Sequence, residues 1–315
     1  MNKKFDVIVI GELNVDLIMN QLQSFPETGK EKLAEKMSLT LGSSSAIFAS
    51  NLAALGMKVS FVGKIGNDIF GNFCKNQLCE KGVDTSMLIQ SDALQTGATV
   101  ILNFGEDRAM ITHQGAMKNL GIEDITIEML STAKHLHFSS YFLQPGFKYN
   151  LHNLFRMAKD AGLTTSLDVQ WDPVEEWDFD YKKVLPHVDI FLPNETELLK
   201  LTGAASIDAA LNVINDYGKF ILVKQGKQGS LLSYKNKTVR GKSFLNDKVV
   251  DAIGAGDSFN AGFVFKFIKE FPPEDCQVFG NLVGAISTTK PGGTAAFINY
   301  DETLKIAKAK FAYED

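Results

Sequence analysis

Short apolar runs alternate with longer amphipathic stretches along most of the 315-residue chain. The runs have the length and composition of buried strands and lie at 7–10, 59–62, 135–138, 165–167, 190–192, 220–223 and 231–233. Helical spacing marks the stretches near 45–55, 68–81, 149–161, 195–201, 207–217 and 258–270. Such alternation is typical of a mostly parallel sheet with helices on both faces, so we predict the α/β class.

Two segments interrupt this pattern, at about 12–40 and 97–113. Within the second, 96–103 and 109–112 have strand character and flank the polar turn 105–108, which predicts a hairpin. The length allows one large core or two modest domains. Because no repeat or Pro/Ser-rich linker divides the chain, we expect one domain over 1–315, with the two interrupting segments as appendages.

The run Asp251–Gly262 joins an extended apolar segment to a helix through a glycine-rich turn. Free N–H groups at a helix start favour an anion, and the helix dipole adds to this preference. Asp257 would lie at the mouth of that turn, where a carboxylate can accept a proton from an alcohol that attacks phosphorus. The alternative is a helix capped by Asp257, with glycines that serve only the turn.

Several motifs together resemble those of one enzyme family. Asp251–Asp257 looks like the C-terminal signature of the PfkB (ribokinase-like) carbohydrate and nucleoside kinases, with Ala252 where threonine is usual. The segments 41–56 and 61–71 are similar to the N-terminal signature, and 11–16, 194–197 and 224–229 also match. The resemblance implies a ribokinase-like fold whose small β-sheet lid is formed by 12–40 and 97–113. It also implies an ATP-dependent carbohydrate kinase.

The resemblance assigns the catalytic base to Asp257. It places Gly254, Ala255 and Gly256 around the transferring phosphoryl group. The expected reaction is direct in-line transfer to a primary hydroxyl of a small sugar or sugar acid.

Asn14 and Asp16 are candidates for sugar binding. Two residues apart on an extended segment, their side chains would share one face and could bind neighbouring hydroxyls. An Asx turn is the alternative interpretation. The resemblance adds Gly42 and Ser43, which stand where the family has Gly-Gly, and Ile47, which replaces an asparagine that contacts sugar. That last departure leaves the substrate open.

Arg108 is a further substrate candidate, because a guanidinium in a lid turn could fork onto a hydroxyl, a carboxylate or a phosphate. A solvated turn arginine is the alternative. The substrate class therefore stays open between a neutral hexose or pentose and a sugar acid.

The nucleotide side involves more distant segments. Asn194 and Glu197, three apart at a helix start, resemble the family's box that organises hydrated Mg²⁺, and an ordinary helix cap is compatible with this. The resemblance also places Lys224, Gly226 and Gly229 along ATP, and Asn281 beside the adenine. It implies a monovalent cation, potassium, with Asp251 as its side-chain ligand.

Composition excludes several other functions. A formal charge of −5 with scattered lysines predicts no nucleic-acid partner, and no apolar run approaches the roughly 20 residues that span a bilayer. Three cysteines without metal spacing indicate reduced thiols and a cytoplasmic protein. The family's lids take part in dimers, so a homodimer through the lid is a further hypothesis.

Three alternatives remain beside a sugar kinase. A nucleoside kinase would share all the phosphate-side motifs. A catalytically silent sugar sensor would not need Asp257. A nicotinamide-dependent enzyme would need G-x-G-x-x-G after the first strand, which 11–16 does not supply.

Overall fold

The computed structural model describes residues 3–104, 107–235 and 237–314. Its main sheet has eight strands in the order β14-β13-β12-β11-β10-β9-β1-β4. β4, β1, β9, β10, β11 and β12 are parallel, whereas β13 and β14 are antiparallel. The strand bounds are β1 Phe5–Ile10, β4 Val59–Val62, β9 Ala133–Ser139, β10 Thr164–Asp168, β11 Ile190–Phe191, β12 Phe220–Lys224, β13 Ser230–Tyr234 and β14 Lys237–Gly241. The predicted α/β class is confirmed, and the seven strands predicted from the alternating pattern fall in this sheet.

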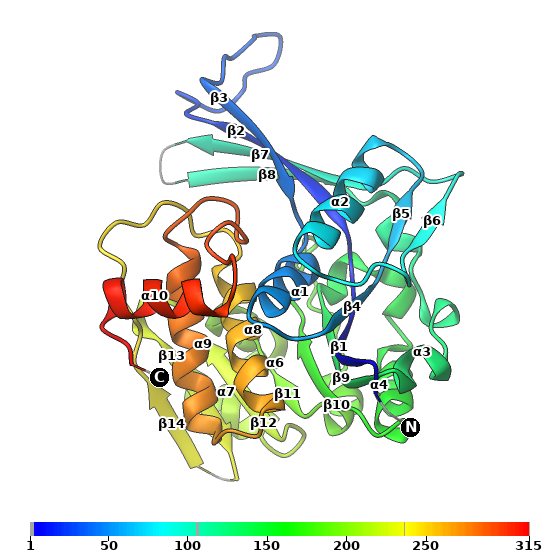
Figure 1. The fold of residues 1–315 in the computed structure, drawn as a ribbon, viewed down its shortest axis with the longest axis vertical. Helices are drawn as coiled ribbons and strands as arrows, with labels where there is room; N and C mark the ends of the chain where they lie inside the picture. The colour runs from blue at the N-terminus through cyan, green and yellow to red at the C-terminus, as the bar shows by residue number, and fades with distance from the viewer. Residues whose placement is uncertain (1–2, 105–106, 236, 315) are drawn as a thin grey trace.

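Helices cover both faces of the sheet (Figure 1). One face carries α1 Ser44–Ala54, α2 Ile69–Glu80, α8 Ala255–Ile268, α9 Pro273–Ser287 and α10 Tyr300–Phe311. The other carries α3 Ile127–Ser131, α4 Leu151–Asp160, α5 Tyr181–Val184, α6 Glu195–Thr202 and α7 Ile207–Ile214. Side chains alternate between the two faces of each strand, so each face has a hydrophobic core of its own. On β1, Val7 and Val9 pack in the core on the α8 side, and Ile8 and Ile10 pack in the core on the α4 side. No helix in the described ranges is long and apolar enough to cross a membrane.

A second sheet, the lid sheet, projects from one end of the molecule (Figure 1). Its order is β3-β2-β7-β8, with β2 Asn14–Asn20, β3 Lys36–Leu41, β7 Gly97–Phe104 and β8 Asp107–His113. The predicted hairpin is β7–β8, and turn residues 105 and 106 lie outside the described residues. The short pair β5 Lys64–Gly66 and β6 Ile89–Ser91 lies beside α2, at the upper right of Figure 1. Short 3₁₀ helices complete the chain: η1 Gly115–Asn119, η2 Ile122–Asp124, η3 Tyr141–Leu143, η4 Pro145–Phe147, η5 Leu185–His187 and η6 Gly226–Gln228.

The direction of the parallel strands gives the sheet two chemically different edges. The carboxyl ends of β1, β9, β10, β11 and β12 gather beneath the lid sheet, which is where ligands bind in open α/β sheets. At the opposite edge Asp189 precedes β11 and is buried. Its Oδ2 accepts from Lys159 Nζ at 2.6 Å and from the Thr165 amide at 2.9 Å, and its Oδ1 accepts from Lys219 Nζ at 3.0 Å. Burial opposes ionisation of Asp189, but the two lysines outweigh it and lower the pKa.

Asp189→Asn should destabilise the protein by about 1–3 kcal/mol at pH 7, because two charged donors lose their anionic acceptor. The folded-state pKa of Asp189 lies below its ordinary value of 3.8, so its contribution is present above about pH 4 and is lost as the pH falls. The difference between wild type and variant in the free energy of unfolding should therefore narrow below pH 4. Urea unfolding across pH 3–8 measures this, with the exposed Asp216→Asn as control. A difference that does not depend on pH would contradict the assignment.

Candidate active site

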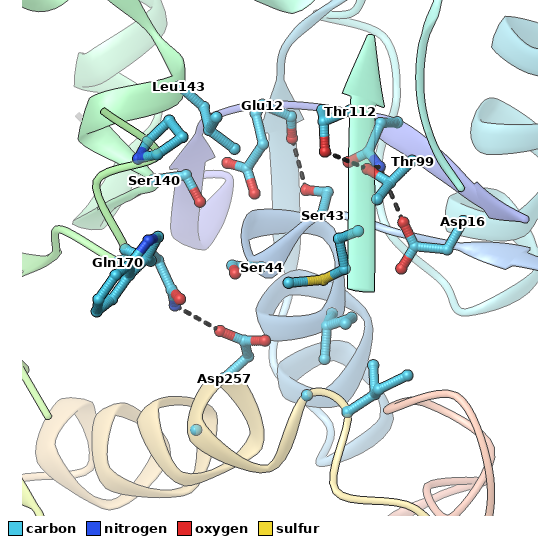
Figure 2. A pocket seen from close by; sticks show the side chains of 18 of the residues that line it. Glu12, Asp16, Ser43, Ser44, Thr99, Thr112, Ser140, Leu143, Gln170 and Asp257 are labelled. Carbon is cyan, nitrogen blue, oxygen red and sulfur yellow. Dashed lines mark hydrogen bonds between the residues drawn. The ribbon is translucent and has the colours of Figure 1, made fainter. Parts of the chain in front are cut away.

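A cavity of about 1170 Å³ lies between the lid sheet and the carboxyl ends of the main strands. It exceeds the range of about 300–1,000 Å³ that suits one drug-sized ligand, and it leaves room for two substrates end to end. Its lining comes from segments far apart in the chain, including β2, the start of α1, β7–β8, the loops after β9 and β10, and the start of α8. Figure 2 shows acidic and hydroxyl side chains from these segments facing one another.

β2 places Asn14 and Asp16 on the face of the lid sheet that closes this cavity, as the two-residue spacing predicts. Asn14 Nδ2 donates to Asp16 Oδ1 at 3.0 Å and to the hydroxyl of Thr99 at 3.1 Å. A Cβ on Gly42 would lie 2.3 Å from Asp16 Oδ1, so only glycine leaves room for this pair. Burial, assisted by the charge of Glu12, raises the pKa of Asp16 to about 6. A ligand hydroxyl that donates to Asp16 would replace the lost hydration.

Ser43 occupies a glycine-like conformation, with φ of 73°. Its hydroxyl donates to the carbonyl of Glu12 at 2.6 Å and accepts from the Ala46 amide at 2.9 Å, so it caps α1. Glu12 itself lines the cavity although its side chain is nearly fully buried. It accepts from the hydroxyl of Ser45 at 2.5 Å, and burial raises its pKa. Glu12 is therefore an acid of the cavity in addition to Asp16 on the lid sheet and Asp257 on α8.

Ile47 lines the cavity wall but is nearly fully buried. A Cβ built on Gly254 would lie 3.0 Å from Ile47 Cγ2, and a Cβ on Gly293 would lie 3.0 Å from Ile47 Cδ1. The isoleucine therefore packs between two glycine turns and braces the loop that precedes α8.

The start of α8 offers the expected anion cradle. Gly254 has φ of 70°, a conformation that favours glycine, and α8 begins at Ala255. The Ala255 amide donates to the Ala252 carbonyl at 3.3 Å, but no acceptor within the described ranges takes the amides of Gly256 or Asp257. A Cβ on Gly256 would come no nearer to a neighbouring atom than 3.7 Å, at Lys224 Nζ. Free amides beside open space at a helix N-terminus fit a phosphate group.

The Asp257 carboxylate sits at the same helix start and faces the cavity (Figure 2). It is 7% exposed, and its Oδ1 accepts from Gln170 Nε2 at 2.9 Å. Burial raises its pKa to about 7, and the charge of Asp168 contributes in the same direction. A carboxylate with this pKa suits general-base work near neutrality.

Lys224 forms a buried ion pair beneath the cradle. Its Nζ donates to Asp168 Oδ2 at 2.5 Å, and the same oxygen accepts from Asn260 Nδ2 at 2.5 Å. Burial lowers the pKa of Lys224, but Asp168 and Glu197 outweigh it, so the pKa is raised. The ammonium group is therefore held charged beside the space that a phosphate would fill.

Asn194 and Glu197 form a capping box at the start of α6. The Glu197 amide donates to Asn194 Oδ1 at 2.8 Å, and the Asn194 amide donates to Glu197 Oε2 at 2.8 Å. Burial and the charge of Asp168 raise the pKa of Glu197 to about 7. Both residues also line the cavity, so the cap and a ligand role are compatible.

The acids around Lys224 leave this half of the cavity short of positive charge, because one ammonium faces Asp168, Glu197 and Asp257. In the portion of the chain that the structure describes, no group of three or more His, Cys, Asp or Glu side chains is arranged to hold a metal. Carboxylates that do not form a full ligand set by themselves fit Mg²⁺, because that ion keeps several of its waters and binds through one or two carboxylates and the phosphates of a substrate.

Other predicted site residues lie at the margin of the cavity or away from it. Gly226 and Arg108 line the cavity, with Arg108 exposed on β8. Gly229, Asn281 and Asp251 are not in its lining. Asn281 Nδ2 instead donates to the Ser230 hydroxyl at 2.9 Å. The carboxylate of Asp251 accepts from the amides of residues 253 and 292, each at 2.9 Å.

Among the residues of the site that were not predicted are the polar residues Glu12, Ser140, Asp168 and Gln170. The available signal was their position, because each is a polar residue at or just after a buried strand. Glu12 follows β1, Ser140 follows β9, Asp168 ends β10 and Gln170 follows it.

A family model described as pfkB family carbohydrate kinase matches residues 4–299. This chain belongs to that family. It is a carbohydrate kinase of a family that includes sugar kinases and nucleoside kinases. It is 27% identical over 327 residues to the 5-dehydro-2-deoxygluconokinase of Lacticaseibacillus casei, with 98% of each chain covered. The family match does not support the two alternatives of a silent sugar sensor and a nicotinamide-dependent enzyme.

Solved structures share the fold. The adenosine kinase of Sinorhizobium meliloti superposes with a TM-score of 0.85 at 24% identity and covers 96% of this chain and 99% of its own. A putative ribokinase II from E. coli, solved with ATP and Mg²⁺, has a TM-score of 0.83 at 21% identity, with 98% and 99% covered. The predicted ribokinase-like fold with a smaller second sheet is therefore confirmed.

Proposed function

We propose that this kinase transfers the γ-phosphoryl group of ATP, in line and without a phosphoenzyme, to a primary hydroxyl of a small sugar or sugar acid. The observation that carries the proposal is the buried Asp257 carboxylate at the start of α8, with its pKa raised to about 7 beside the free amides of the cradle. Asp257 accepts the proton of the attacking hydroxyl. The amides of Gly256 and Asp257, with Lys224, stabilise the charge on the transferring oxygens.

The nucleotide would lie along the carboxyl ends of β11 and β12. Asn194, Lys224 and Gly226 are the nearest candidates for its phosphates, since they line that part of the cavity. Gly229 and Asn281 would lie farther along, toward the nucleoside. Mg²⁺, when bound, neutralises phosphate charge, with Glu197 acting through water. The E. coli ribokinase II structure with ATP and Mg²⁺ supports this choice by its similar fold.

The acceptor sugar would lie under the lid sheet. Asp16, held by Asn14 and given room by Gly42, accepts from its hydroxyls. Ser43 and Ile47 shape the wall beneath. Arg108 supplies the positive charge on the lid side, and a sugar acid would place its carboxylate there. The similarity to a 5-dehydro-2-deoxygluconokinase supports an acceptor of sugar type.

A nucleoside acceptor is the second candidate, and an apolar patch favours it. Phe142, Leu143, Trp171 and Val174 line the cavity after β9 and β10. Trp171 is 47% exposed, and its ring packs edge-on against that of a second tryptophan, Trp177, with 5.1 Å between the ring centroids. An exposed aromatic ring beside a sugar site can stack on a planar base. The similar fold of an adenosine kinase supports this alternative.

Substrate-dependent ADP release measures the reaction and selects between the two candidates. The panel is ribose, fructose, tagatose, 2-keto-3-deoxygluconate, inosine and adenosine with MgATP. Asp257→Asn should lower turnover by at least about a hundredfold, because a positioned base is lost, while ATP still binds. Asp216→Asn, an exposed carboxyl change, is the control. Near-normal turnover of Asp257→Asn would refute the assigned base. Activity with nucleosides alone would select the second candidate.

We also propose that a monovalent cation binds beside Asp251, where that carboxylate joins the loop before α8 to the loop at residue 292. Potassium should raise the rate, because an ordered loop positions the cradle amides. Rates in potassium and tetramethylammonium salts at equal ionic strength measure this. Equal rates in the two salts would rule out activation by a monovalent cation.

We further propose that two copies pair through the outer face of the lid sheet. Strand pairing puts apolar residues on that face, opposite the cavity, and Met37 and Ile111 are each 66% exposed. The face comprises Leu17, Met19, Met37, Leu39, Val100, Leu102 and Ile111.

Sedimentation should show a dimer for wild type and a monomer for Met37→Glu, because a charge would be buried in the interface. Val213→Glu, at an exposed apolar position on α7, is the control and should stay dimeric. A wild type that sediments as a monomer at all concentrations would contradict the pairing.

A further inference from the structure

Gln170 joins two buried carboxylates, Asp168 and Asp257, in the half of the cavity that holds Lys224 and the cradle amides, here called the phosphate half. Its Nε2 donates to Asp257 Oδ1 at 2.9 Å and to Asp168 Oδ2 at 3.1 Å, and its backbone amide donates to Asp168 Oδ1 at 3.3 Å. The amide nitrogen carries two hydrogens, so both bonds form at once. The dashed line from Gln170 to Asp257 in Figure 2 is the first of them.

The backbone at Gln170 adopts an unfavourable conformation to make this bridge. Its φ is 61°, in the left-handed region, where a residue with a side chain is strained. The residue follows the last position of β10 and lines the cavity. Strain of this kind persists where surrounding structure fixes it, and it clusters at active sites.

The bridge determines which oxygen of Asp257 remains available. Oδ1 is held by Gln170, which leaves Oδ2 to receive a proton from a ligand hydroxyl, beside the Ser44 hydroxyl that also favours the ionised carboxylate. The bond from Gln170 also acts against the effect of the surroundings on the pKa of Asp257. Asp168, Glu12 and Glu197 act on it with like charge and Lys224 with opposite charge. A donor that binds the ionised form favours the carboxylate against burial.

We propose that Gln170 is a positioning residue for phosphoryl transfer, which anchors Asp257 Oδ1 to the Asp168–Lys224–Asn260 cluster and aims Oδ2 at the acceptor hydroxyl. The inference rests on the proposed function, since it assumes that Asp257 is the base. No group is transferred to Gln170. The proton moves from the sugar hydroxyl to Asp257 alone.

Gln170→Leu keeps the approximate volume and removes both donors. Turnover should fall by about tenfold or more, while the KM for ATP changes by less than about twofold, because the base is misplaced and the nucleotide is not. The acid limb of kcat/KM should move to higher pH by about one unit, the size of one hydrogen bond to a charged group. Gln170→Asn, one methylene shorter, should recover part of the turnover if one of the two bonds re-forms.

A second readout does not depend on activity. Carbon-13 NMR of labelled aspartate carboxyl carbons, with Asp257 assigned by its absence in Asp257→Asn, follows the titration of that group directly. Gln170→Leu should raise the measured pKa of Asp257. The control is Gln144→Leu, which removes a buried glutamine that donates to the carbonyls of Ser139 and Ser140 and, among the described residues, makes no hydrogen bond to Asp168 or Asp257. It should lower thermal stability without moving the Asp257 titration.

An unmoved Asp257 titration in Gln170→Leu would overturn the proposal, and so would reduced turnover with an unmoved acid limb, which indicates a merely structural role. Near-normal turnover in Asp257→Asn would instead overturn the assignment of the base. The two failures are therefore distinguishable.

Discussion

The buried ion pair between Lys224 and Asp168 is the contact on which the phosphate half of the cavity depends. β10 and β12 end on either side of β11, so the sheet order brings these residues together although they lie 56 positions apart. Removing one partner of such a pair leaves an uncompensated charge and costs about 3–5 kcal/mol. Through Asp168 the pair also fixes Asn260 and Gln170, and through Gln170 it reaches Asp257.

The two edges of the sheet shift the pKa of a buried aspartate in opposite directions. Asp189, at the amino edge, meets two lysines and two groups of Thr165, so its pKa is lowered. Asp257, at the carboxyl edge, is buried beside other acids with a single shared ammonium, so its pKa is raised. The first arrangement stabilises the fold. The second leaves an excess of negative charge, which a bound cation such as Mg²⁺ would offset.

Much of the fold was predictable because strand and helix periodicity are local. The glycine turn before Asp257 and the pair Asn14 and Asp16 were predictable for the same reason: each lies in a short contiguous motif. Gln170 was not, because its importance comes from a bond to a carboxylate 87 residues away. Asp168 and Glu12 likewise carry no motif of their own. Ile47 was expected to face the substrate, and its packing against two glycine turns depends on a loop more than 200 residues later.

That packing changes how the acceptor must be recognised. Where an amide would reach the ligand, Ile47 braces Gly254, and Asn51 one turn farther along α1 ties the same region by donating to Gly293 O and the Ser258 hydroxyl, each at 2.9 Å. Through these two side chains, helix α1 braces the cradle. On the proposed assignment, recognition of the acceptor falls to Asp16 on the lid sheet, which closes the cavity over Asp257. Burial in that cavity raises the pKa of Asp257 to about 7, so exclusion of water would affect both the binding of the acceptor and the strength of the proposed base.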